Sequence, residues 1–289
     1  MTSSRKLWLV LLAIGLLAQA PAAMAGPPRI IPINVPDAVA TRAYGINPTG
    51  DIVGSYTDIA KRVRGFLLRD GVFSSIDVPG ADSTEAYGIT PQGDIVGQYI
   101  VAGVYHGFLL RDGTLTYPND APGQPNTMPY GVTPYGTIVG CVHGGPKGMH
   151  GFVLTADGNA SFQEPVNTMH LGINSSGDIV GYGPEVPGGP DHGYLISDGV
   201  MSWFHFGGSL LTRPRGISAT GDIVGVYLSA DTKTHGFLLS HGEFSSIDVD
   251  SPGVIQTRAM GINAVGEIVG DYKDSTGTHG YVLTRRGGE

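Results

Sequence analysis

Short apolar runs separated by glycine, proline, asparagine and aspartate cover the chain from about residue 30 onward. Residues 43–46 (Ala-Tyr-Gly-Ile) and 51–56 (Asp-Ile-Val-Gly-Ser-Tyr) predict two strands, and the Asn-Pro-Thr-Gly at 47–50 is typical of a short hairpin loop. Residues 65–68 and 72–78 predict a third and a fourth strand. Because no sustained 3.6-residue period follows the first 25 residues, we predict an all-β fold.

Three sequence landmarks recur six times in the same order, at spacings of 43, 43, 41, 44 and 45 residues. The first is Gly-Ile, or once Gly-Val, and its glycines are Gly45, Gly88, Gly131, Gly172, Gly216 and Gly261. The second is Ile-Val-Gly, preceded by Asp51, Asp94, Thr137, Asp178, Asp222 or Glu267. The third is Gly-Phe or Gly-Tyr, preceded by Arg64, His106, His150, His192, His235 or His279. Six units of four antiparallel strands predict a six-bladed β-propeller, a single domain over residues 26–289.

The two ends of the repeat array are complementary. The sixth copy stops after its third strand, near residue 285, whereas residues 33–38 match residues 76–81 of the first copy's fourth strand. We therefore predict that residues 30–35 pair with the strand around 281–283, complete the last blade and close the ring. A β-solenoid, the competing architecture, would have no use for this exchange because its two ends do not meet.

The first 25 residues are predicted to be a signal peptide that is not part of the fold. Arg5 and Lys6 precede an apolar run over residues 7–18, and Ala23-Met24-Ala25 matches a small-residue cleavage site. The run is shorter than the ~20 residues of a membrane-spanning helix. We therefore expect an exported protein, periplasmic or extracellular, with no membrane span after cleavage, and we expect a monomer.

Net charge limits the classes of partner that the mature chain can bind, and the cysteine content limits its disulfides. The formal net charge of the 289 residues is −8, and it becomes −10 when the two cations of the signal peptide are removed. A net negative charge argues against nucleic acid or an anionic membrane as a partner, since both require a basic surface. Cys141 is the single cysteine, so no intramolecular disulfide forms, and we interpret it as a packed thiol.

The repeated unit also resembles a known family. The run Gly-Ile-Asn-x-x-Gly-Asp-Ile-Val-Gly-x-Tyr, then His-Gly-Phe-Leu, then Phe-Ser-Ser-Ile-Asp-Val-Pro-Gly-Ala is similar to the HAF-type extracellular repeats of bacteria. The resemblance covers residues 30–285, with Arg64 in place of histidine in the first copy and Thr137 in place of aspartate in the third. It implies an exported location and no particular activity.

Two repeated series of polar residues are better explained by structural hydrogen bonds within each copy than by metal binding. The five histidines of the third landmark belong to different blades, so they cannot converge on one ion, and we expect each imidazole to bond a neighbouring loop. The aspartates of the second landmark stand alone in their turns, whereas Ca²⁺ takes six to eight oxygen ligands. No motif of a catalytic nucleophile occurs, and we predict no metal and no cofactor.

The positions at which the copies differ form the candidate site. Side chains one and three residues before each first-landmark glycine are expected near one mouth of the central channel. The candidate binding residues are Arg42, Tyr44, Tyr87, Tyr130, Arg213, Arg215 and Arg258. Arginine and tyrosine combine rigid contact area with directional donors, which favours an anionic or hydroxyl-rich ligand: a glycan, an anionic small molecule or an envelope protein. Tyrosines that only pack between blades and arginines that only face solvent remain the alternative.

Two classes of function are compatible with such a mouth. The first is an exported, non-catalytic binding or scaffold protein, and the second is an exported hydrolase or lyase whose active site occupies the same mouth. Only Glu85 and His170 are acid–base candidates nearby, so the sequence favours binding over catalysis.

Overall fold

The computed structural model describes residues 28–145, 148–163 and 167–284 of the chain. These residues form 24 β-strands and no helix, in agreement with the all-β prediction. The described part of the chain therefore contains no helix suited to crossing a membrane. The predicted signal peptide, residues 1–25, lies outside the described residues.

The strands pair antiparallel in consecutive groups of four, and each group corresponds to one copy of the repeat. The first groups are β2 (Ala40–Ile46), β3 (Ile52–Thr57), β4 (Val63–Arg69) and β5 (Val72–Ile76); β6 (Ser83–Ile89), β7 (Ile95–Val101), β8 (Val104–Arg111) and β9 (Thr114–Thr116); and β10 (Asn126–Val132), β11 (Ile138–Gly145), β12 (Gly148–Leu154) and β13 (Ala160–Phe162). The next are β14 (Met169–Ile173), β15 (Ile179–Pro184), β16 (Asp191–Ser197) and β17 (Val200–Phe204); and β18 (Leu211–Ile217), β19 (Ile223–Leu228), β20 (Thr234–Ser240) and β21 (Glu243–Ile247). The last is β22 (Gln256–Ile262), β23 (Ile268–Lys273) and β24 (Thr278–Thr284), joined by β1 (Arg29–Ile33).

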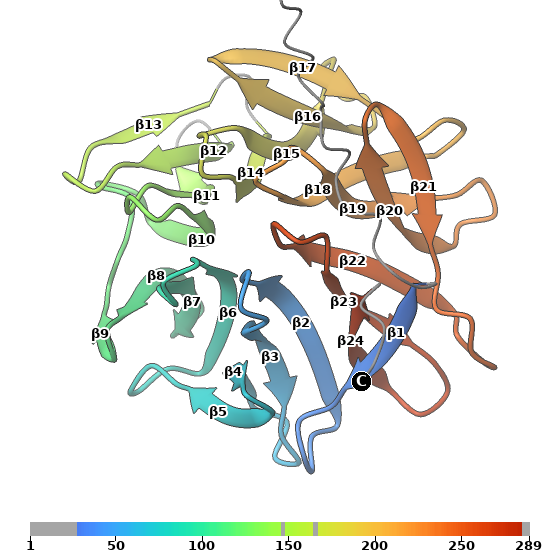
Figure 1. Ribbon diagram of the computed structural model, residues 1–289. Coiled ribbons are helices and arrows are strands. Elements are labelled where there is room, and N and C mark those ends of the chain that lie inside the picture. The colour runs from blue at the N-terminus through green and yellow to red at the C-terminus, as the bar shows by residue number, and fades with distance from the viewer. Residues whose placement is uncertain (1–27, 146–147, 164–166, 285–289) are drawn as a thin grey trace, which may run out of the picture.

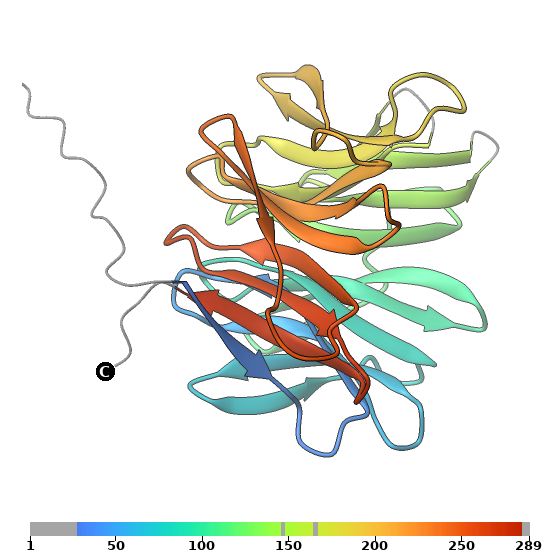
Figure 2. The same cartoon turned by 90° about the vertical axis from the view of Figure 1, so that its right-hand side faces the viewer.

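The N-terminal strand β1 completes the last group. It runs antiparallel to β24, with Ile30 opposite Leu283 and Ile33 opposite Gly280, which confirms the pairing predicted from the sequence. Figure 2 shows β1, in blue, beside the red C-terminal strands. Pro32 lies opposite Tyr281 on this outer strand, which pairs with no other described strand, and an edge strand of this kind tolerates a residue without an N–H.

The groups radiate from a common axis, with the first strand of each innermost and the fourth outermost (Figure 1). Neighbouring first strands approach so closely at the first-landmark glycines that a side chain would not fit. A Cβ atom on Gly45 would lie 2.4 Å from the carbonyl oxygen of Tyr87, and one on Gly261 would lie 2.5 Å from that of Tyr44. The last copy of the repeat therefore contacts the first as tightly as copies adjacent in sequence contact each other.

The second and third landmarks have a common steric origin in the buried core. The aromatic side chain of the third landmark is fully buried in every copy: Phe66, Phe108, Phe152, Tyr194, Phe237 and Tyr281. The glycine of Ile-Val-Gly makes room for this ring, since a Cβ atom on Gly54 would lie 2.7 Å from the ring of Phe66. Burial of an aromatic ring of this kind is a large favourable contribution to folding in each copy.

Candidate functional site

Each first strand presents to the axis the side chain that precedes its first-landmark glycine. These side chains surround a cavity of about 30 Å³ and are Tyr44, Tyr87, Tyr130, Leu171, Arg215 and Met260. A second axial cavity, of about 110 Å³, is lined by the same residues together with the following glycine and Ile or Val of each copy. Four of the predicted site residues, three tyrosines and one arginine, thus converge on the axis.

The three tyrosines form a continuous aromatic row beside Glu85. The rings of Tyr44 and Tyr87 stack with 4.7 Å between centroids, and Tyr130 meets Tyr87 edge-on at 4.9 Å. The Glu85 carboxylate accepts hydrogen bonds from the hydroxyls of Tyr44 (3.3 Å) and Tyr87 (2.9 Å) and from the Gln98 amide (2.8 Å). Burial, and next the Glu85 charge, raise the pKa of both hydroxyls, so they remain protonated donors at neutral pH.

Arg258 is held by a carboxylate of its own hairpin. Its Nε lies 3.0 Å from Oδ2 of Asp271 and its Nη2 lies 2.8 Å from Oδ1, and Asp271 is fully buried. Burial raises the pKa of Asp271, while the charges of Arg258, Arg42 and Arg215 oppose that rise. Arg258 could leave this pair for a ligand only by abandoning a buried carboxylate, which is unfavourable.

Arg213 is also committed, but to a neighbouring group of strands. Its Nε and Nη2 lie 2.9 and 2.6 Å from Oδ2 of Asp191 on β16, and its guanidinium stands 4.9 Å from the ring centroid of Tyr182. Arg213 lines neither axial cavity. Arg213 therefore does not converge on the axial cavities with the four predicted residues that line them.

Arg42 and Arg215 make no ion pair with any described residue. The Nε of Arg215 is buried and has no hydrogen-bond partner in the described part of the chain, although the side chain lines the axial cavity. Arg42 lies opposite Ser55 in the β2–β3 hairpin, outside both cavities. Arg215 is thus the one predicted arginine that combines a place at the cavity with an unused buried donor.

A buried cluster next to Tyr130 is apolar and rich in sulfur. Met128, Met169, Leu171 and Cys141 form a buried cluster, and the Sγ of Cys141 lies 3.2 Å from Nε2 of His143. Burial raises the pKa of the Cys141 thiol to about 12, so it stays protonated. The interpretation of Cys141 as a packed thiol is confirmed.

His170 is a structural residue and not an acid–base group of the mouth. It is buried on the far face of β14, where its Nδ1 lies 2.8 Å from the hydroxyl of Tyr194. Burial lowers the pKa of His170 to about 4, so the ring is neutral at physiological pH. Glu85 is the acid–base candidate that remains at the mouth.

Four of the repeated histidines bond the segment that follows the outermost strand of their group, and His192 bonds Glu185 just after β15. The partners of their Nδ1 atoms are Asp120 for His106, the Gln163 carbonyl for His150, Glu185 for His192, Asp248 for His235 and Asn34 for His279. The expectation of a local bond is confirmed, although most partners are side chains and not carbonyls.

The turn carboxylates also form local hydrogen bonds: Asp51 accepts one from Asn47 at 3.0 Å and one from Arg69 at 2.8 Å. The described residues include no group of three or more His, Cys, Asp or Glu arranged for a metal ion.

Two residues of this site, Asp271 and Gln98, were not among the candidates from sequence. Both lie on second strands, directly opposite the position three residues before the glycine: Arg258 faces Asp271 and Glu85 faces Gln98. The register of the hairpin is the signal that could have revealed them, because residues directly opposite on one face of an antiparallel pair are in contact.

The fold, and not the sequence, connects this chain to known proteins. No family model and no curated protein matches it. A putative gluconolactonase is 17% identical, with 93% of this chain and 95% of that chain covered and a TM-score of 0.55. The β-propeller domain of the Trilobed protease from Pyrococcus furiosus is 13% identical (84% and 82% covered, TM-score 0.51). The Aleuria aurantia lectin, in complex with Fucα1-6GlcNAc, is 10% identical (85% and 91% covered, TM-score 0.50).

These similarities define the class of the protein as a β-propeller. The radial groups of antiparallel strands and the coverage of most of the chain agree on that fold. Because every identity is low, the similarity extends to the fold and to no shared activity.

Proposed function

We propose that the protein is an exported six-bladed β-propeller, closed by β1 and related to the HAF-type repeat proteins. The 24 strands fit six blades of four, and the pairing of β1 with β24 gives the last blade its outer strand. The contact of Gly261 with Tyr44 places β22, the innermost strand of the last group, against β2, the innermost strand of the first group. The predicted signal peptide and the resemblance of the repeats support export.

The function supported best is non-catalytic binding of a ligand that presents one anionic group to the axial cavity. The observation that carries this proposal is that Arg215 lines the cavity and that its buried Nε has no hydrogen-bond partner among the described residues. A buried donor left unpaired is unfavourable, and a carboxylate or phosphate oxygen would complete it with a charge-assisted bond. Ligand binding would thus satisfy a group that the free protein leaves unsatisfied.

Charge and size agree with an anionic group of this kind. Arg42, Arg215 and Arg258 outnumber Glu85 and Asp271 around the axis, although the whole chain carries a net charge of −8. The axial cavity of about 30 Å³ has room for roughly two water molecules, which matches one carboxylate group and not a whole sugar ring. We therefore propose an acidic glycan or a similar polymer that inserts a single carboxylate, as a uronic acid does.

The two carboxylates of the site favour binding over hydrolysis. Glu85 already accepts hydrogen bonds from two tyrosines, Ser55 and Gln98, which occupy its lone-pair sites, and Asp271 is fully buried against Arg258. A general base must be within hydrogen-bond reach of the proton that it abstracts, and neither carboxylate has a free position of that kind. We therefore place the hydrolase or lyase second.

The experiment is a thermal-shift comparison of glucuronate with glucose on purified mature protein. A ligand at 100 times its dissociation constant stabilises the folded state by about 2.7 kcal/mol, and we expect this effect for glucuronate only. Arg215→Met is expected to abolish the shift, whereas Arg62→Met, at an exposed arginine that pairs with Asp58, is the matched control. Equal shifts with both sugars, or an undiminished shift in Arg215→Met, would contradict the proposal. Cleavage of an acidic polysaccharide incubated with the protein, followed by NMR, would favour the hydrolase or lyase.

A further inference from the structure

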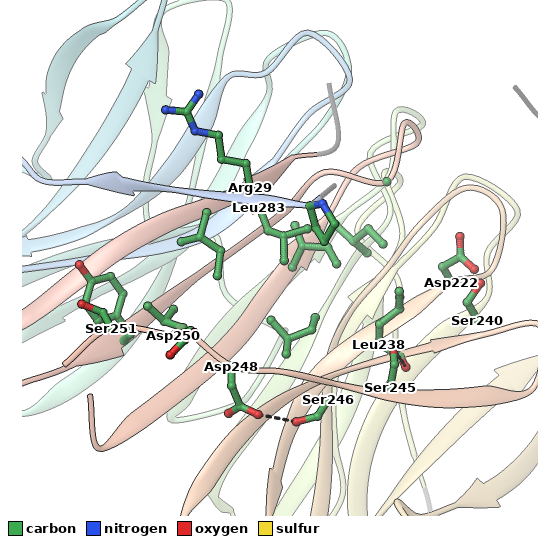
Figure 3. A pocket seen from close by; sticks show the side chains of 18 of the residues that line it. Arg29, Asp222, Leu238, Ser240, Ser245, Ser246, Asp248, Asp250, Ser251 and Leu283 are labelled. Atoms are coloured by element: carbon green, nitrogen blue, oxygen red, sulfur yellow. Dashed lines mark hydrogen bonds between the residues drawn. The ribbon is translucent and has the colours of Figure 1, made fainter. Parts of the chain in front are cut away.

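A cavity of about 820 Å³ lies between β20–β21 and the β22–β24–β1 group (Figure 3). It shares no residue with the 30 Å³ axial cavity and one residue, Ile262, with the 110 Å³ axial cavity. Aliphatic side chains from both groups form much of its wall, among them Leu238, Ile247, Val249, Ile268 and Leu283. Comparison with the equivalent interfaces between other copies explains why the space opens here.

The first difference is a missing arginine at the end of the third strand. Ser240 ends β20, where the first two copies carry Arg69 and Arg111. The cavity at the interface that contains Arg111 is about 150 Å³, compared with about 820 Å³ here. The short Ser240 side chain leaves the space that a guanidinium occupies in the earlier copies.

The same replacement leaves a carboxylate without a cation. Arg69 bonds Asp51 at 2.8 Å, and Arg111 makes the equivalent bond at 2.8 Å in the second copy. The equivalent carboxylate at the large cavity is Asp222, which accepts one bond from the Thr220 hydroxyl at 2.9 Å and forms no ion pair among the described residues. Asp222 lies beside Ser240 at one end of the cavity in Figure 3.

The second difference is the loss of aromatic filling. At the preceding interface, where Ser197 also replaces arginine, Phe204 and Phe206 pack against the next group, and Phe206 stacks on Tyr227 with 3.9 Å between centroids. The strand register places Ile247 at the position of Phe204. A smaller aliphatic residue and a serine therefore coincide at the large cavity.

The third difference concerns Tyr272, which lines the cavity and is 9% exposed. In the preceding copy, the hydroxyl of Tyr227 lies 3.0 Å from Oγ of Ser246. Pro32 of β1 takes the place of that serine in the last group, since it lies opposite Tyr281 as Ser246 lies opposite Phe237. The hydroxyl of Tyr272 consequently has no hydrogen-bond partner among the described residues.

The lining is acidic as well as aliphatic. Asp222, Asp248 and Asp250 line the cavity together with one cationic residue, Arg29, whose guanidinium points away from the labelled carboxylates in Figure 3. Asp248 is bonded to His235, whereas Asp250 is exposed and forms no ion pair within the described ranges. The cavity thus presents unpaired negative charge next to an apolar surface.

We propose that this cavity is a second binding site, for a ligand with an ammonium or guanidinium group on an apolar stem. The stem packs against Leu238 and Ile268, and the cation lies at the carboxylate of Asp222. The hydroxyl of Tyr272 accepts or donates the hydrogen bond that Ser246 provides to Tyr227 in the preceding copy. The chemical class is that of alkylamines and of basic side chains, and the proposal does not depend on the axial site.

The test uses hexylamine and hexanol as probes in calorimetric titrations of the mature protein. The two probes share the apolar stem, and we expect hexylamine to bind about tenfold more tightly because its hydrogen bond to the Asp222 carboxylate is charge-assisted. Ser240→Arg restores the arginine of the earlier copies, and we expect it to weaken hexylamine binding about tenfold or more. Ser197→Arg, at the equivalent position of β16, is the matched control and is expected to change affinity less than about twofold.

A second pair of variants covers the case in which Ser240→Arg does not fold. Asp222→Asn is expected to weaken hexylamine binding about fivefold, the size of one exposed charge contact, while Asp51→Asn has no effect. Equal affinity for hexylamine and hexanol would overturn the proposal. Equal effects of Asp222→Asn and Asp51→Asn would overturn it as well.

Discussion

Arg258 and Asp271 face each other across the β22–β23 hairpin and form a two-point ion pair whose carboxylate is fully buried. The pair lies beside the axial cavity, so it contributes to the stability of the site as well as to its charge. Burial raises the pKa of Asp271, and the folded state therefore binds a proton there more readily than the unfolded chain does. The contribution of this group to stability is largest below the ordinary carboxyl pKa and decreases as the pH rises through the raised folded value.

Replacing Arg258 is expected to destabilise the protein in a pH-dependent manner. Arg258→Met leaves Asp271 buried without its partner, which costs about 3–5 kcal/mol at neutral pH. The loss should be smaller at pH 5, because the pKa of Asp271 rises further without Arg258 and protonation then removes the buried charge. Denaturant unfolding at both pH values measures this, with Arg258→Met/Asp271→Asn as the control that recovers stability at pH 7. A loss independent of pH would show that the carboxylate is not the cause.

The pairing of β1 with β24 is expected to be essential for stability. Ile33 on β1 is 6% exposed, and Ile33→Ala should reduce the free energy of unfolding by about 2–5 kcal/mol. Ile31, on the same strand, is 41% exposed, and Ile31→Ala should change it by about 0.5 kcal/mol. Urea unfolding of the two variants distinguishes them. Similar losses in both would contradict the role assigned to β1.

The glycine of the second landmark is expected to tolerate no side chain. A Cβ atom on Gly54 would lie 2.0 Å from the carbonyl oxygen of Arg42, so Gly54→Ala forces a backbone shift and should destabilise the protein by about 1–3 kcal/mol. No heavy atom lies within 4 Å of a Cβ atom built on Gly207, and Gly207→Ala is the matched control with little expected change. Melting temperatures of both variants provide the comparison, and an unchanged value for Gly54→Ala would refute the steric explanation of the motif.

Cys141 is expected to be unreactive in the folded protein. Its thiol is buried and its pKa is raised to about 12, so very little thiolate is present at pH 8. Ellman's reagent should therefore react with Cys141 at once in guanidinium chloride and only on the timescale of unfolding in native buffer. Rapid reaction of the native protein would contradict the buried packing of Cys141 with Met128 and Met169.

The strands were predictable because Gly54 and Phe66 carry a steric requirement that every copy repeats in the same order. The β1–β24 pairing was predictable because residues 33–38 match residues 76–81. The partners of the variable residues were not predictable in this way. Asp191, which holds Arg213, belongs to a neighbouring group, and its contact depends on how the groups pack. The large cavity is likewise lined by Ser240 and Ile247 together, a combination that becomes apparent only when the packing between groups is known.

The central claim is that Arg215 receives an anionic group in the axial cavity, and a high-resolution crystal structure with acetate tests it most directly. The carboxylate of this probe has the size that the cavity accommodates, and its planar shape distinguishes it from water in the electron density. The account predicts a carboxylate oxygen within about 3 Å of the Arg215 Nε, beside Tyr44 and Tyr87. An axial cavity that contains only water at saturating acetate, with the probe elsewhere or absent, would contradict it.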